Sequence, residues 1–168
     1  MPYETAILRD VISVHPDQSV AECLNLMISK RVRAVPVVEV DGRFVGMCTI
    51  RALLKKLIPI SATFEDGLPT LDFVVGSAPG AAKKLSRIRT QPIRDHLEDE
   101  CPVVHEDTPT WEVIRLLCRY GSPLPVVREA DHALVGLVSD QSIVSELDGL
   151  ISDMEHHGPI AGGSTAVS

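Results

Sequence analysis

Apolar positions change their spacing twice along the first 58 residues, which predicts a helix followed by two strands and a second helix. A helix with one apolar stripe is predicted by the three- and four-residue spacing of Val20, Cys23, Leu24, Met27 and Ile28. The apolar runs at 34–38 and 43–49 are typical of buried strands, and Asp41-Gly42 between them is a turn signal. A closing helix is expected from about 50 to 57.

The same pattern returns 90 residues later, with a drift of one residue in one block. The second half is therefore expected to hold strands at 124–127 and 133–139, a turn at 130–132, and a closing helix from about 140 to 151. Four blocks correspond in the same order: 14–17 with 104–107, 22–27 with 112–117, 36–38 with 125–127, and 44–49 with 134–139.

The first helix of the second half has a broader apolar stripe than its counterpart. Asp17 in the first unit, and Asp107 or Thr108 in the second, stand where an N-cap is expected. Two neighbouring helical lines carry the stripe, one with Trp111, Ile114, Arg115 and Cys118, the other with Val113, Leu116 and Leu117.

Each unit has the order β-α-β-β-α and spans about 50 residues, which is too short to bury a comfortable core alone. We therefore expect an α/β fold in which the two repeats pack as one pseudo-two-fold module. The predicted domains are repeat one at 3–58, a connector at 59–91, repeat two at 92–150 and a flexible C-terminal tail at 151–168.

Composition narrows the class of function. A chain of 168 residues with 45% hydrophobic residues can form a folded core. A net charge of -7 and an aromatic content of 4% disfavour a nucleic-acid partner, because phosphates need basic surfaces and bases need stacking platforms. Glu4, Arg9 and Asp10 interrupt any apolar leader, and no apolar stretch is long enough for a bilayer, so we expect a cytoplasmic protein without a membrane partner.

No catalytic or metal-binding constellation is visible in the sequence, so an enzyme is not expected. Cys23, Cys48 and Cys118 lie in apolar runs and are expected to be buried and reduced. His15 and His105 occupy equivalent positions, which indicates a shared turn or capping role over catalysis.

The repeated blocks resemble the CBS domain, and a tandem pair of such domains is commonly called a Bateman module. The resemblance rests on Pro-Val-Val at 36–38 and 125–127 and on Val-Gly-apolar-apolar-Thr/Ser at 45–49 and 135–139. It covers roughly Tyr3 to Ile58 and Pro92 to Leu150.

The resemblance implies a regulatory module that senses an adenosyl nucleotide or related anion in the cleft between the repeats and modulates a partner protein. AMP, ADP, ATP or S-adenosylmethionine are the regulatory ligands it suggests, with a homodimer as the assembly. The alternative is a ligand-free structural module for dimerisation, and the residues leave the ligand and the partner open.

The resemblance also implies ligand-binding positions. Arg33 precedes the Pro-Val-Val strand, where similar repeats bind phosphate, and Thr49 and Ser139 stand where they hold phosphate or ribose. Ser122 or Pro123 stands at the equivalent place in repeat two, so the first site, with its Arg, is expected to be the stronger anion site.

The carboxylate that takes the ribose hydroxyls in similar repeats is absent from both of its usual places. Ala52 and Ser142 stand there instead, so poor discrimination between ribose and deoxyribose is expected. Simpler roles remain open for the other positions: Thr49 and Ser139 as N-caps, and Arg33 as a solvated charge or a partner of Glu39 or Asp41.

The connector holds an apolar segment at 71–75, which we expect to dock on the module because it would be a sticky patch if exposed. It also holds a basic run that is either a solvated helix face or a docking surface for an acidic partner or for ligand phosphates, namely Lys83, Lys84, Arg87 and Arg89.

Overall fold

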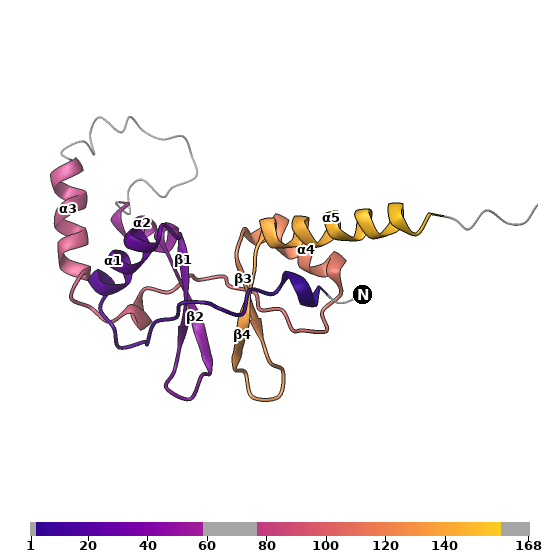
Figure 1. Cartoon of the computed structure of the whole chain (residues 1–168). Helices are drawn as coiled ribbons and strands as arrows, with labels where there is room; N and C mark the ends of the chain where they lie inside the picture. Colours follow the sequence, from indigo (N-terminus) through magenta and orange to yellow (C-terminus); the bar gives the residue numbers. More distant parts are fainter. Residues whose placement is uncertain (1–2, 59–76, 159–168) are drawn as a thin grey trace, which may run out of the picture.

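Two β-hairpins lie side by side in the computed structural model, which describes residues 3–58 and 77–158, and helices cover the same end of each hairpin (Figure 1). The first hairpin consists of β1 (Ala34–Val38) and β2 (Phe44–Thr49), and the second of β3 (Leu124–Val127) and β4 (Leu134–Val138). The helices of the repeats are α1 (Val20–Lys30), α2 (Ile50–Leu57), α4 (Thr110–Tyr120) and α5 (Asp140–His156). The mixed α/β fold with two repeats is thus confirmed.

Both hairpins are antiparallel and carry a register shift near the turn, between Val37 and Val38 in one and between Val126 and Val127 in the other. The strand expected before the first helix of each repeat is reduced to a single parallel bridge. Val14 bridges to Val37, and Val104 to Val126.

The N-terminal segment of each repeat packs on the other repeat. The backbone N–H of Leu8 donates to the Leu137 carbonyl at 2.7 Å, and the N–H of Glu98 donates to the Met47 carbonyl at 2.9 Å. Positions 8 and 98 are equivalent in the repeat, as are 47 and 137, so the exchange is reciprocal. Figure 1 shows the N-terminal segment beside the second hairpin and α5.

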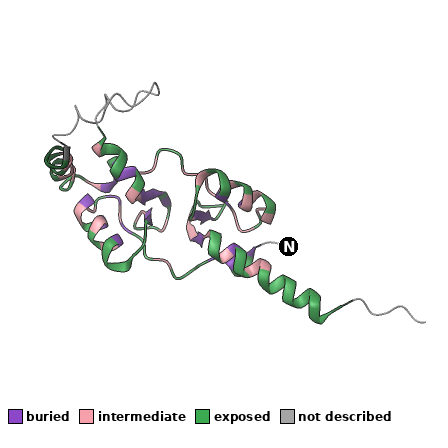
Figure 2. Ribbon diagram, turned by 90° about the horizontal axis from the view of Figure 1, so that it is seen from above, coloured by how far each residue is buried: buried purple, intermediate pink, exposed green. Residues whose placement is uncertain are grey.

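The buried side chains form three apolar cores. Figure 2 shows that the buried residues lie between the helices and that the outer faces of the helices are exposed. Ile93 is buried in the core of the first repeat and Tyr3 in the core of the second. A third core joins the hairpins and contains Ala34, Phe44, Met47, Val127 and Leu137. The packed units therefore differ from the sequence repeats 3–58 and 92–150 by the exchanged segments, which contain the short 3-10 helices η1 (Glu4–Ala6) and η4 (Ile93–Asp95).

The predicted caps of the first helices are wrong. Ser19 caps α1 in a capping box with Glu22, because a Ser-x-x-Glu sequence satisfies two free N–H groups at once. Asp17 instead pairs with Arg94. In repeat two, Pro109 precedes α4 without a side-chain cap, and the Thr108 hydroxyl accepts from the backbone N–H of His105 at 2.8 Å.

The buried stripes of these helices are narrower than expected. Cys23 and Met27 are buried, whereas Ile28 is 68% exposed. Trp111 is 82% exposed, and Cys118 is exposed too, which corrects the expectation of a buried thiol there. The buried residues are Val20, Cys23 and Met27 on α1, and Val113 and Leu117 on α4.

The last helix is longer than predicted. It ends at His156 and not near 151, so the predicted tail is helical over its first residues. Gly158 and Pro159 are the first helix-breaking pair after it, which explains the later end. Over the residues that the structure describes, no helix has the length and apolar content that a bilayer crossing requires.

The described part of the connector packs on repeat one. Helix α3 (Ser77–Ile88) lies beside α2, and Ile88 contacts the first core. The predicted basic run begins on this helix, with Lys83 and Arg87 exposed. The apolar segment 71–75, whose docking was expected, lies outside the described residues.

Candidate functional site

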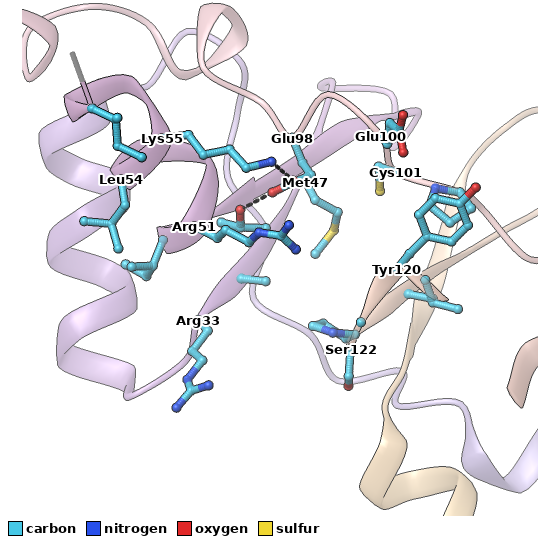
Figure 3. A pocket seen from close by; sticks show the side chains of 18 residues that line it. Arg33, Met47, Arg51, Leu54, Lys55, Glu98, Glu100, Cys101, Tyr120 and Ser122 are labelled. Carbon is cyan, nitrogen blue, oxygen red and sulfur yellow. Dashed lines mark hydrogen bonds and ion pairs between the residues drawn. The ribbon is translucent and has the colours of Figure 1, made fainter. Parts of the chain in front are cut away.

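A cavity of about 590 Å³ lies between the two repeats (Figure 3). One wall is formed by the ends of β1 and β2 and by α2. Glu98 lies on the same wall, and the opposite wall is formed by the residues from Glu100 to Pro102 and by the residues from Tyr120 to Leu124, which link α4 to β3. Because both repeats contribute, a ligand in this cavity would contact both at once.

Much of the cavity wall is apolar. Met47, Ile50 and Leu54 line it from repeat one, and Pro102 and Pro123 line it from the other side. Apolar side chains with a few polar groups between them are the usual lining of a small-molecule site.

Three basic side chains line the cavity: Arg33, Arg51 and Lys55. Arg33 is exposed, and in Figure 3 its guanidinium points away from Glu98. Within the described residues it forms no ion pair with Glu39 or Asp41. Glu39 lies 3.7 Å from Nε2 of His15, and Asp41 accepts from the backbone N–H of Arg43 at 3.0 Å.

Thr49 stands at the junction of β2 and α2, where its hydroxyl makes two hydrogen bonds. Oγ1 accepts from the backbone N–H of Ala52 at 3.0 Å and caps α2, as the simpler interpretation expected. The same hydroxyl donates to Oε2 of Glu98 at 2.5 Å. A hydroxyl has one hydrogen, so the donor capacity of Thr49 is fully used.

Glu98 is a cavity residue that the sequence analysis missed. Its backbone N–H pairs with Met47, which fixes the side chain toward Thr49, and only 17% of the side chain is exposed. Oε1 lies 3.8 Å from Nζ of Lys55. Its counterpart in repeat one is Leu8, so comparison of the two repeats does not indicate a carboxylate at this position. Only knowledge of the exchange would have placed Glu98 in the cavity.

The remaining predicted positions are divided between the cavity and its surroundings. Ser122 lines the cavity, and its hydroxyl accepts from the backbone N–H of Asp140 at 3.1 Å. Ala52 is buried beneath Thr49 and contributes its backbone N–H. Ser139 and Ser142 do not line this cavity but form the capping box of α5, with bonds of 3.0 and 2.9 Å.

Cys101 lines the cavity beside Glu98. Burial, and secondarily the Glu98 carboxylate, raise the pKa of the Cys101 thiol to about 11. The thiol is therefore protonated at neutral pH, and a protonated thiol is a poor nucleophile.

A family model for the CBS domain matches residues 5–59 and 93–149. Solved structures have the same fold. CBSX2, a CBS-pair protein from Arabidopsis thaliana solved in complex with AMP, is 23% identical, with 89% of this chain and 98% of that chain covered and a TM-score of 0.65. The CBS domain pair of protein MJ0100, in complex with 5′-methylthioadenosine and S-adenosyl-L-methionine, is 20% identical, with 89% and 98% covered and a TM-score of 0.59.

Among curated proteins, an uncharacterized protein of Methanopyrus kandleri is 34% identical over 56 residues. The match covers 33% of this chain and spans only 29% of that relative's length.

Proposed function

The chain belongs to the CBS domain family as a tandem pair, and from this premise we propose that it is a regulatory module that binds an adenosyl nucleotide between its repeats and thereby modulates a partner protein. The observation that carries the proposal is the cavity of about 590 Å³ with walls from both repeats. This volume falls within the range of about 300–1,000 Å³ that small-molecule sites occupy. Structural neighbours solved with AMP or S-adenosyl-L-methionine support the choice of ligand class.

The positive charges that line the cavity favour the phosphate end of such a ligand. Arg33 has no competing ion pair with Glu39 or Asp41, and Arg51 extends into the same cavity (Figure 3). A guanidinium is permanently charged and its fork matches phosphate oxygens. We therefore assign the phosphate to the Arg33 side of the cavity.

Modulation of a partner requires that the ligand bind one state of the module more tightly than another. A ligand between the repeats fulfils this condition if their relative position differs between states. We propose a homodimer in the cytoplasm as the working form. The free, buried thiols of Cys23 and Cys48 fit a reducing compartment.

The test is thermal unfolding of the whole chain with AMP, ADP, ATP and S-adenosylmethionine. A ligand present at 100 times its Kd stabilises the folded state by about 2.7 kcal/mol, which raises the melting temperature by several degrees. Arg33→Ala should weaken the binding of a phosphate-bearing ligand by about 1.5–3 kcal/mol, the range of a charged hydrogen bond. Arg43→Ala, which removes the same charge from an exposed residue of repeat one outside the cavity lining, serves as the matched control and should bind as the wild type does.

A second function is favoured by one observation: neither Ala52 nor Ser142 supplies the carboxylate found in similar repeats. This absence favours a structural module for dimerisation that binds no ligand. An unchanged melting temperature across the whole ligand panel would support that function and contradict ours.

A further inference from the structure

The carboxylate of Glu98 makes one end of the cavity a site for hydrogen-bond donors. Oε2 accepts from Thr49, and Oε1 lies 3.8 Å from the Lys55 ammonium, beyond hydrogen-bond distance. An ionised carboxylate has about four acceptor positions on its two oxygens. The group is thus held firmly in place while most of its accepting capacity remains unused.

The hydrogen-bonded pair of Thr49 and Glu98 is unsuited to bind a phosphate group. The hydrogen of the Thr49 hydroxyl is given to Glu98, so Thr49 has no donor for a phosphate oxygen. A phosphate there would also face the negative charge of Glu98 itself. Arg33, whose guanidinium points away from Glu98 in Figure 3, has the opposite character.

We infer that Glu98 is the specificity-determining residue of the cavity, which selects ligands that carry two neighbouring hydroxyl groups. Two adjacent O–H donors match the two oxygens of one carboxylate, as a ribose 2′,3′-diol presents them. Hydrogen bonds to a charged acceptor are stronger than neutral ones, and they are stronger still in a site withdrawn from water. The inference rests on the proposed function, and it reverses the expectation from Ala52 that ribose and deoxyribose are poorly distinguished.

The inference also orients the nucleotide. Its ribose lies against Glu98 and Thr49, its phosphate lies on the side of Arg33, and its base lies on the apolar wall. Each part of the ligand then meets a group of complementary chemistry on a different element.

The experiment is calorimetric titration of the whole chain with AMP, 2′-deoxy-AMP and 3′-deoxy-AMP. For the wild type we expect each deoxy ligand to bind about tenfold to a hundredfold more weakly than AMP, the change that loss of a charged hydrogen bond produces. In Glu98→Gln the ratio should fall to less than about threefold, because the amide is uncharged. The ratio between ligands is the readout, so any general gain or loss of phosphate affinity cancels.

Asp95→Asn is the matched control, since Asp95 is an exposed carboxylate on the same segment, outside the cavity lining. This variant should keep the full preference for AMP. Equal affinity of the wild type for AMP and both deoxy ligands would overturn the inference and leave the proposed function intact, and this comparison needs no variant. A preference that persists undiminished in Glu98→Gln would assign the diol to another residue. No binding of AMP to the wild type at all would overturn both the inference and its ligand class.

Discussion

At the scale of single residues, His96 is a buried polar side chain whose hydrogen bonding is incomplete among the described residues. It is 5% exposed, its Nε2 lies 2.7 Å from Oε1 of Gln91, and its Nδ1 has no partner among the residues that the structure describes. Burial, and secondarily the charge of Lys56, lower the pKa of His96. The folded protein therefore holds this imidazole neutral.

This pKa shift predicts a loss of stability in mild acid. Since the pKa is lower in the folded state, the unfolded chain takes up the proton first, and the free energy of unfolding falls as the pH drops below about 6.5, the ordinary value for His. His96→Gln keeps a donor toward Gln91 but cannot titrate. Urea unfolding at pH 8 and pH 5 should show a smaller loss in this variant than in the wild type, and an equal loss would contradict the assignment.

Residue-level prediction from the sequence succeeded where the role is local. Thr49 and Ser139 cap the helices that follow them, because a cap depends on residues only three positions away. It failed for Glu98, whose position depends on a backbone pair with Met47, 51 positions earlier in the chain. No local pattern distinguishes that carboxylate from exposed neighbours such as Asp99.

At the scale of elements, the two hairpins are the most predictable part. The first strand of each hairpin occupies the predicted residues, because a short Val-rich run before a turn is typical of a strand. Helix ends were less predictable: Ser19 displaced Asp17 as the cap, and α5 continues to His156. The exchange of N-terminal segments between the repeats was not predicted, because a sequence repeat does not show on which copy each segment packs.

The exchange predicts unequal effects at two equivalent glycines. A Cβ added at Gly136 would lie 2.3 Å from the carbonyl oxygen of Leu8, which is backbone, whereas at Gly46 it would meet Cδ1 of Leu97 at 2.8 Å, which can rotate away. Gly136→Ala should therefore lower the free energy of unfolding by about 1–3 kcal/mol, the range for overpacking, and Gly46→Ala by clearly less.

Urea midpoints of the two variants measure this difference. Each glycine occupies the same place in its hairpin, so differences in strand propensity largely cancel and each variant serves as the control for the other. Equal midpoints would mean that the crossing at Leu8 is no tighter than the one at Leu97.

At the scale of the whole molecule, the outer faces of the helices expose large apolar side chains on both repeats. Ile28 is 68% exposed on repeat one, and Trp111 and Val144 are 82% and 63% exposed on repeat two. Apolar area of this kind commonly marks a surface that is covered by another protein. A second copy of the chain is the partner that the proposed homodimer supplies.

Light scattering at micromolar concentration should accordingly give about twice the chain mass of 18.2 kDa. Trp111→Lys should shift the molecules toward monomers, because a charge would be placed in the covered surface. Val40→Lys is the control, since Val40 is 91% exposed but lies next to the turn of a hairpin, away from the helices. A monomeric wild type would contradict the assembly.

The reciprocal exchange also delays the packing of residues 3–8 while the chain is being synthesised on the ribosome. The partner of Leu8 is Leu137, so the two meet only after another 129 residues have been added. At about 5–20 residues per second, that delay is on the order of ten seconds. During it, Tyr3 and Ile7 have no core to enter, because the one that they complete does not yet exist. Tyr3 and Ile7 are thus made well before the core in which they are buried.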